Sequence, residues 1–410
     1  MEIKKLGNNG FFWNVLGGGL NAGQASFLLI LISRKYDLST AGLVTIAYAF
    51  AVFFQGIGKY GIRNFQVTDM REEYGFGDYL KSRKISVGCA LIGAGFFLFW
   101  KYIDGSYGLE KAILIFEVVV LKMIDAYEDV YLGRLQQLDQ FCRGARIMAV
   151  RLLATTCTLA ATAYMGIKIH LVFLTGIIVS GFFDLEAFRF TKGWARSACK
   201  GNTVGIMLSC IPLCIGTTLM VYVGNIPKYM IDACLSEEIQ AIFGYLMLPV
   251  FAVTLLNQFI YQPFVKTLGM KWDSGNRKKF YGTIAGQCAA VLMIAIAALI
   301  GGVGVGLPVL SGLYAVNLSE YWKEFMVLLA GGSLYAIGYY LNIPLTIMRK
   351  QKQIAVGYGM AAVICFIIGK DFVLVRGMMG AAILYVTVNG SLVILYAFLI
   401  LNSWRKEKVL

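Results

Sequence analysis

Apolar runs of about twenty residues alternate with short polar clusters along this chain. A helix of about 20 apolar residues spans the hydrocarbon core of a bilayer, which is about 30 Å thick. The pattern therefore predicts an all-α polytopic membrane protein. Twelve membrane-spanning helices are expected, at residues 11–33, 40–62, 84–103, 109–131, 144–166, 168–187, 204–224, 239–263, 280–301, 323–347, 353–371 and 377–402.

The composition agrees with this pattern. Of the 410 residues, 58% are apolar and 15% are charged, and the mean hydropathy is +0.69. A soluble domain carries about 25% charged residues. The amino-terminal stretch MEIKKLGNNGFFWNVLGGGL has no small-residue cleavage site after its apolar run, so we expect an uncleaved first helix.

Lysine and arginine residues are distributed unevenly between the two sides of the predicted helices. With the amino terminus in the cytoplasm, the cytoplasmic segments hold 26 of these residues and the outer segments hold nine. Because basic residues collect in cytoplasmic loops, this ratio predicts that both termini are cytoplasmic. The net charge of +14 is then a property of the loops and does not predict nucleic-acid binding.

The longest polar break near the middle of the chain is RFTKGWARSACKGNT, at 189–203. It predicts an N-terminal six-helix lobe at 1–190, a cytoplasmic linker at 191–203 and a C-terminal six-helix lobe at 204–410. An even number of helices in each half gives the two halves the same orientation. No loop exceeds about 25 residues and no Walker A motif is present, so we expect neither an enzymatic domain nor a cofactor.

The cysteine and histidine residues of this sequence predict no disulfide, metal or nucleophilic site. The nine cysteines lie mostly in apolar runs and form no CxxC pair, which predicts neither a disulfide framework nor a zinc site. The one histidine, His170, follows Lys168 closely in a predicted loop, where we expect it to be solvated.

The fourth predicted helix is unusual because it carries five charged residues on less than half of its circumference, at about 100° per residue. Lys122 can pair with Asp125 at i+3, which lowers the free-energy cost of burying either charge in a membrane. Two interpretations stay open: a salt-bridge network between helices, and a proton or cation relay along a cavity. The five residues are Glu117, Lys122, Asp125, Glu128 and Asp129.

Two polar stripes lie on the first two predicted helices. On the first, three amides within about 80° of one another suit either a hydroxyl-rich ligand or bonds between helices; they are Asn14, Asn21 and Gln24. The second stripe, in QGIGKYGIRNFQVTD at 55–69, is formed by Gln55, Lys59, Arg63 and Gln66. It is a cavity entrance if the helix continues to Gln66, and a membrane anchor if the helix ends at Lys59.

The fifth predicted helix carries Arg146 near its start and Arg151 deeper in the membrane. Arg151 has no acidic residue at i±3 or i±4, so its partner must come from another helix or from a ligand. Fixed cations in a lumen select anions, and arginine matches phosphate oxygens in a bidentate manner. In the second half, polar residues lie near prolines that favour bending helices: Asn225, Lys228, Asn257, Gln258 and Asn342.

Four stretches, spread over essentially the whole chain, resemble the Wzx-type O-antigen flippases of the MOP superfamily, which also contains the MATE transporters. They are QGIGKYGIRNFQVTD, DAYEDVYLGRLQQLDQFCRGARI, NIPKYMIDACLSEEIQAIFGYLMLPV and YYLNIPLTIMRKQKQ. The resemblance implies two six-helix lobes around a cationic central cavity, with alternating access. The family's N-x-P-[KR]-Y segment maps onto Asn225, Pro227, Lys228 and Tyr229.

The activity that the resemblance implies is translocation of an undecaprenyl-diphosphate-linked oligosaccharide across the bacterial inner membrane, without enzymatic chemistry. Its implied partners are the lipid-linked substrate, the bilayer, an O-antigen polymerase and a chain-length regulator. We expect Arg63, Arg146 and Arg151 to hold the diphosphate, with Lys59 and Lys122 tuning the field. The carboxylates of the fourth helix would couple transport to an ion. The alternative is a MOP-type multidrug exporter, for which those carboxylates would bind organic cations.

Overall fold

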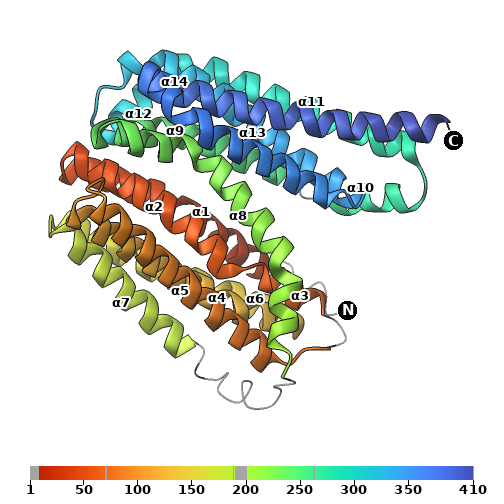
Figure 1. Cartoon of the computed structure of the whole chain (residues 1–410), viewed down its shortest axis with the longest axis horizontal. Helices are drawn as coiled ribbons and strands as arrows, with labels where there is room; N and C mark the ends of the chain where they lie inside the picture. Colours follow the sequence, from red (N-terminus) through yellow and green to blue (C-terminus); the bar gives the residue numbers. More distant parts are fainter. Residues whose placement is uncertain (1–8, 70–71, 188, 190–200, 262–263, 410) are drawn as a thin grey trace. The chain divides into compact units, whose positions relative to one another are not determined.

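The computed structural model describes residues 9–69, 72–187, 189, 201–261 and 264–409, and within these ranges it contains helices and turns but no strand (Figure 1). The side chains of residues 9–11, 14, 186–187, 252–261, 266, 303 and 406–409 lie outside the description as well. The chain divides into two compact units, Met1–Val221 and Tyr222–Leu410. The division falls inside a helix, beyond the predicted linker, most of which lies outside the described residues.

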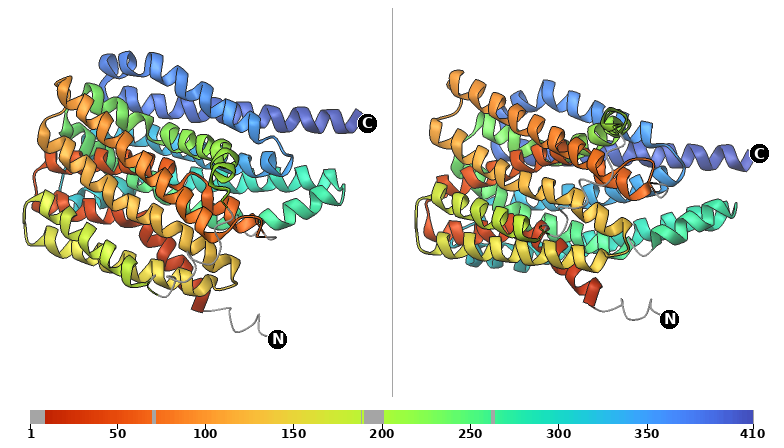
Figure 2. Two further views of the ribbon diagram at one scale, coloured as in Figure 1. Left: turned by 60° about the horizontal axis from the view of Figure 1, so that its bottom comes forward. Right: turned by 90° about the horizontal axis from the view of Figure 1, so that it is seen from below.

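The first unit is built around one central helix, α5, which packs against α2, α3, α4, α6 and α7. Figure 2 shows the long helices of this set running side by side. The beginning of α8 also belongs to this unit, because Ile206 and Cys210 are buried in one apolar cluster with Phe76 and Val130. The helices are α1 (Asn9–Lys35), α2 (Leu38–Lys59), α3 (Ile62–Thr68), α4 (Phe76–Ile103), α5 (Leu109–Gln137), α6 (Phe141–Tyr164), α7 (Ile169–Ala187) and α8 (Thr203–Cys234).

The second unit is built around α13, which contacts α14, α9, α11 and α10. Small residues allow this close packing: a Cβ added at Gly331 would lie 2.5 Å from the Tyr385 ring, and one at Gly332 would overlap Val250. Its helices are the rest of α8, α9 (Glu237–Tyr261), α10 (Phe264–Asp273), α11 (Arg277–Gly301), the π-helix η2 (Gly302–Gly306), α12 (Leu307–Tyr314), the 3₁₀-helix η3 (Ser319–Tyr321), α13 (Trp322–Ile347) and α14 (Gln351–Val409).

Each of the twelve predicted spans overlaps a described helix. The last two overlap α14, whose backbone leaves helical geometry at Gly377 (φ 58°, ψ −142°), between the two predicted segments. By length and apolar composition alone, eight helical segments among the described residues are able to cross a membrane. The central helix α5 is not one of them, because of its charges. The short helices α3, α10 and α12 were not expected from the apolar runs.

The break between α2 and α3 means that the helix does not continue to Gln66, which was the condition given for a cavity entrance. Helix α2 ends at Lys59, and Tyr60 (φ 52°) and Gly61 (φ 69°) both adopt left-handed conformations before α3 begins. Arg63 and Gln66 therefore lie on a second short helix that packs against α5. The end of α2 at Lys59 is the condition given for a membrane anchor, but Gln66 at the end of the stripe is fully buried.

Gly61 should be hard to replace, because a left-handed φ is costly for an L side chain and the space beside it is filled. A Cβ at this position would lie 2.6 Å from the Leu213 Cβ. We expect Gly61→Ala to lower the free energy of unfolding by about 2–4 kcal/mol, from left-handed strain together with overpacking. The measurement is denaturant titration of the purified chain in mixed micelles.

Gly105 is the matched control, since its φ is 75° and a Cβ there would have no neighbour within 4 Å. Gly105→Ala should show only the left-handed strain, about 1–2 kcal/mol. Equal losses for the two variants would mean that the contact with Leu213 contributes nothing.

Candidate functional site

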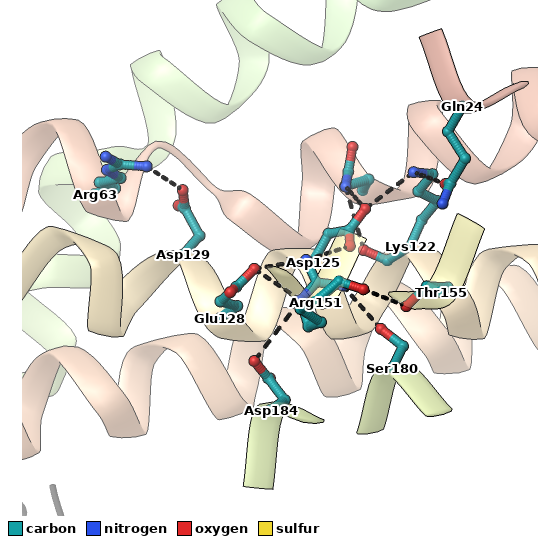
Figure 3. A network of polar contacts seen from close by, with 11 residues as sticks. Gln24, Arg63, Lys122, Asp125, Glu128, Asp129, Arg151, Thr155, Ser180 and Asp184 are labelled. Carbon is teal, nitrogen blue, oxygen red and sulfur yellow. Dashed lines mark hydrogen bonds and ion pairs between the residues drawn. The ribbon is translucent and has the colours of Figure 1, made fainter. Parts of the chain in front are cut away.

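The candidate site is a network of buried charges inside the first unit, centred on α5 (Figure 3). All five charged residues predicted on this helix are at least nine-tenths buried. Their partners come from the neighbouring helices α1, α2, α3, α4, α6 and α7, as the contacts described below show. The interpretation as a salt-bridge network between helices is thus confirmed as a structural fact, and the relay remains a question of function.

Arg151 of α6 lies at the centre of the network and is 2% exposed. Its Nη2 lies 2.5 Å from Glu128 Oε2 and 2.7 Å from Asp125 Oδ1. On the α7 side, Nη1 donates a hydrogen bond to Ser180 Oγ at 2.8 Å, and Nε lies 3.9 Å from Asp184 Oδ1. One guanidinium therefore compensates carboxylates from two helices, which is the condition for keeping them charged in a medium of low dielectric constant.

Lys122 forms the second centre of the network. Its Nζ lies 3.0 Å from Asp125 Oδ2, the i+3 pairing that the spacing predicts, and it donates to Gln24 Oε1 at 3.0 Å. Gln24 Nε2 in turn donates to Thr156 Oγ1 at 3.0 Å, and Gln55 Nε2 donates to Asp125 Oδ2 at 3.3 Å. Gln24 of α1 and Gln55 of α2 are thus hydrogen-bonded to side chains of other helices in the first unit.

Asp129 forms the third centre, where it lies between two arginines. Arg83 Nη2 is 2.9 Å from Asp129 Oδ2, and Arg63 Nη1 is 3.3 Å from Oδ1. Arg63 also donates to Gln136 Oε1 at 3.1 Å, and its side chain remains 29% exposed. Arg83 is fully buried and donates from Nη1 to the Gly58 carbonyl at 2.8 Å, in the last turn of α2. Arg83 therefore joins the end of α2 to α5 and satisfies a terminal carbonyl.

Arg83 and Asp184 are not among the residues predicted from sequence. The predicted third span begins at residue 84, which places Arg83 in a loop, whereas α4 begins at Phe76. A signal was present, because Asp78, Ser82 and Ser86 recur at intervals of four and all three are buried. Asp184 is an acidic residue inside the predicted sixth span, which is itself a reason to expect a functional or paired group.

Apart from Glu117, which pairs with His170, the described network has four cationic and four anionic side chains, distributed unevenly along α5. Arg151 and Lys122 face three carboxylates, whereas Arg63 and Arg83 share one. Among the described residues, no group of three His, Cys, Asp or Glu side chains is placed to hold a metal ion. The balanced set is Arg63, Arg83, Lys122, Arg151, Asp125, Glu128, Asp129 and Asp184.

His170 is partly buried and paired with a carboxylate, which corrects the expectation of a side chain that is simply solvated. It lies in the first turn of α7, and its Nδ1 is 3.0 Å from Glu117 Oε2 on α5. The imidazole meets this carboxylate because α7 packs against α5, which sequence spacing alone does not indicate. Glu117 is accordingly paired with His170, away from the other carboxylates of its helix.

The expected convergence of Arg63, Arg146 and Arg151 is also corrected. Arg151 is enclosed by carboxylates, and Arg146 is exposed, with its guanidinium carbon 5.6 Å from the Trp13 ring centre. The physical reason is that a buried guanidinium needs carboxylate partners, and α5 and α7 supply them. Arg63 alone of the three combines a network contact with partial exposure.

The remaining predicted residues are more dispersed. Lys59 is half-buried at the end of α2, and Asn21 is exposed on α1. In the second unit, Asn225 and Lys228 are half-buried on α8, and Asn342 donates to the Tyr358 hydroxyl at 2.9 Å. The side chains of three further residues lie outside the described ones: Asn14, Asn257 and Gln258.

Removing the central guanidinium should destabilise the first unit strongly. Arg151→Gln leaves Asp125 and Glu128 buried without their main partner, so we expect a loss of about 3–5 kcal/mol in the free energy of unfolding. Denaturant titration in mixed micelles measures this loss. Arg146→Gln is the matched control, because Arg146 is exposed, and it should change the value by less than about 0.5 kcal/mol. A loss below about 1 kcal/mol for Arg151→Gln would contradict the assigned pairing.

Arg83 and Lys84 offer a second matched pair, since they are adjacent in sequence but Arg83 is fully buried and Lys84 is exposed. We expect Arg83→Gln to lower the free energy of unfolding by about 3 kcal/mol, because it removes one partner of Asp129 and one of the Gly58 carbonyl. Lys84→Gln should have little effect in the same titration. Similar losses at both positions would refute the structural role given to Arg83.

No family model and no curated protein matches the sequence of this chain. Solved structures of similar fold do exist, at low sequence identity. An inward-facing multidrug resistance MATE family transporter of the MOP superfamily gives a TM-score of 0.67 at 11% identity, covering 94% of this chain and 93% of that one. The lipid II flippase MurJ, in an inward closed conformation, gives 0.66 at 14% identity, covering 95% and 86%.

A third similar structure is a MOP superfamily transporter from Pyrococcus furiosus, with a TM-score of 0.58 at 11% identity, covering 97% of this chain and 94% of that one. The reverse polarity of its binding pocket is described as suggesting a different function. Identities this low bear on the fold alone. This chain is an all-helical polytopic membrane protein with a fold like those of the MATE transporter and of MurJ.

Proposed function

We propose that this protein is a transporter that translocates an undecaprenyl-diphosphate-linked oligosaccharide across the bacterial inner membrane by alternating access. The fold supports transport in general, because the similar structures include both drug transporters and a lipid II flippase. It does not discriminate between these substrates. The choice rests on the charges of the first unit.

The observation that carries the proposal is that four buried carboxylates of the first unit, on α5 and α7, have arginine or lysine partners. Four arginine and lysine side chains lie against these four carboxylates, so this set offers no excess of negative charge to an organic cation. Arg63 is the member that keeps 29% of its side chain exposed. A guanidinium in that situation suits the oxygens of a diphosphate, which it can contact in a bidentate manner.

Electrostatics explain why such a substrate needs a transporter. Moving a diphosphate through hydrocarbon costs tens of kcal/mol by Born estimates. A polyprenyl tail can remain in lipid while the headgroup passes along a polar path. With the cell interior negative, outward movement of an anion is favoured by about 2.3 kcal/mol per charge for each 100 mV.

The carboxylates around Arg151 support ion coupling within the same proposal. Asp125, Glu128 and Asp184 share Arg151 and Lys122, which makes this part of the network formally one charge negative. Binding one proton there would neutralise it. Glu117 and Asp129 remain further coupling residues of the proposal, with His170 as the partner of Glu117.

Other predicted residues keep a place in the proposal as ligand contacts. Asn21 is exposed and has amide groups that suit hydroxyl-rich sugars. Lys59 lies at the end of α2, close in sequence to Arg63, and Lys228 provides a cation in the second unit. A location in the bacterial inner membrane with both termini in the cytoplasm, and partnership with a polymerase and a chain-length regulator, belong to the same proposal.

A multidrug exporter is the second candidate, favoured by one observation. The MATE family transporter has a TM-score as high as that of the flippase, 0.67 against 0.66. Under this reading, the three carboxylates around Arg151 would exchange a proton for an organic cation. The two candidates differ in the sign of the substrate, which a transport assay measures directly.

We expect the purified chain in proteoliposomes to translocate a fluorescent polyprenyl-diphosphate-linked oligosaccharide, measured by accessibility of the label to a membrane-impermeant quencher. Arg63→Ala should lower the initial rate at least 10-fold, because it removes the partly exposed guanidinium. Arg63→Lys should keep an intermediate rate, since the charge remains but the bidentate geometry is lost.

Arg143→Ala is the matched control, because Arg143 is exposed at the start of α6. It should transport like the unmodified chain, and all variants should incorporate equally into the liposomes. Export of ethidium from cells, with no movement of the lipid-linked saccharide, would replace the proposal by the second candidate.

A further inference from the structure

Helix α10 is the basis of an inference that is independent of the transport path. It has ten residues, Phe264–Asp273, and is about 15 Å long, which is too short to cross a bilayer. It contacts α9, α11 and α13 of its own unit. In both views of Figure 2 the corner formed by α10 and the start of α11, drawn in teal, projects from the other helices of the unit.

The helix is amphipathic, with an apolar face that protein covers only in part. At about 100° per residue, Phe264, Leu268, Trp272 and Val265 fall within an arc of about 100°. Leu268 is fully buried against the unit, whereas Phe264 is 44% exposed and Val265 is 37% exposed. The middle of the apolar face, at Leu268, is therefore packed against the unit, whereas the two edges of the face, at Phe264 and Val265, remain exposed.

Positive charge is concentrated where α10 meets α11. The segment 264–279 contains five lysine and arginine residues and a single acidic residue, Asp273. Three of the five, Arg277, Lys278 and Lys279, form the first turn of α11, which has no acidic residue. Cations at a helix amino terminus oppose the helix dipole, so local helix stability does not explain them. The side chains of Lys278 and Lys279 are exposed.

The corner is held in place by contacts of its own. The Arg277 guanidinium carbon lies 3.5 Å from the centre of the Trp272 ring, and its Nη1 donates to the Trp272 carbonyl at 2.8 Å. Lys271 Nζ donates to Thr283 Oγ1 at 2.6 Å, which ties α10 to α11. A tryptophan beside arginine and lysine side chains is the combination found at membrane–water interfaces.

We propose that the corner Phe264–Lys279 is a docking surface for anionic phospholipid headgroups. Helix α10 lies along the membrane surface, with Phe264 and Val265 at the acyl boundary, and Lys278 and Lys279 contact the phosphates. Charge complementarity selects an anionic lipid over a zwitterionic one. The exposed apolar edge selects a lipid over a soluble anion, because a free phosphate has nothing to cover it.

The test measures lipid binding by the purified full-length chain, with native mass spectrometry of the protein titrated with phosphatidylglycerol in detergent. Lys278→Gln/Lys279→Gln should weaken phosphatidylglycerol binding about 30-fold, which corresponds to about 1 kcal/mol for each lysine removed. Lys406→Gln/Lys408→Gln removes the same charge from the end of α14 and should bind normally. Phe264→Ser/Val265→Ser should also weaken binding, while leaving the net charge unchanged.

Equal weakening by the two lysine double variants would overturn the proposal, because binding would then reflect net charge alone. So would phosphatidylcholine binding as tightly as phosphatidylglycerol. Competition by inorganic pyrophosphate, with Phe264→Ser/Val265→Ser binding normally, would show a site for soluble anions in place of a lipid surface. None of these outcomes depends on the transported substrate.

Discussion

The pairing of the Arg151 guanidinium with Asp125 and Glu128 is the interaction on which the first unit depends. Both carboxylates are buried, and a buried charge without a partner costs several kcal/mol. The pairing therefore fixes α6 against α5, and through Ser180 and Asp184 it fixes α7 as well. Lys122, Gln24 and Gln55 extend the same constraint to α1 and α2. These helices are therefore joined by polar contacts that centre on buried charges of α5 and α6.

The sequence allows the helices to be predicted far better than the partners of their charges. Each of the twelve spans predicted from the apolar runs overlaps a helix among the described residues, since a span of about 20 apolar residues has few alternatives in a bilayer. The charged arc of α5 and the Lys122–Asp125 pair also follow from helical spacing. The partners of Arg151 do not, because Asp125, Glu128 and Asp184 come from other helices, whose rotation is set by tertiary packing. Arg83 was misplaced for a simpler reason: α4 begins at Phe76, so this residue belongs to a helix and not to a loop. The partner of His170, Glu117, comes from another helix and depends on how α7 packs against α5.

The break after Lys59 shows how backbone geometry determines the environment of a side chain. A continuous helix would have carried Arg63 and Gln66 along the line of Gln55, whereas two successive left-handed residues turn the chain into α3. Gln66 is then buried beside α5, and Gln137 Nε2 donates to its carbonyl at 2.7 Å. Residues spaced three or four apart share a helix face only where the helix is continuous, so this spacing does not predict a shared face across left-handed residues. In this stretch, Gly61 is the residue in the sequence that indicates such a break.

The two arginines at Asp129 are not equivalent, and the difference decides which of them is suited to a ligand. Arg83 is fully buried and donates to both Asp129 Oδ2 and the Gly58 carbonyl, so moving it would leave Asp129 Oδ2 without its donor and the carbonyl with Ser86 Oγ alone. Arg63 is partly exposed and lies at the longer distance, 3.3 Å against 2.9 Å. If Arg63 turned toward an anionic ligand, Asp129 would keep Arg83 as its partner. Arg83 thus lowers the free-energy cost of moving Arg63 away from Asp129, because no carboxylate of the network is left without a cationic partner.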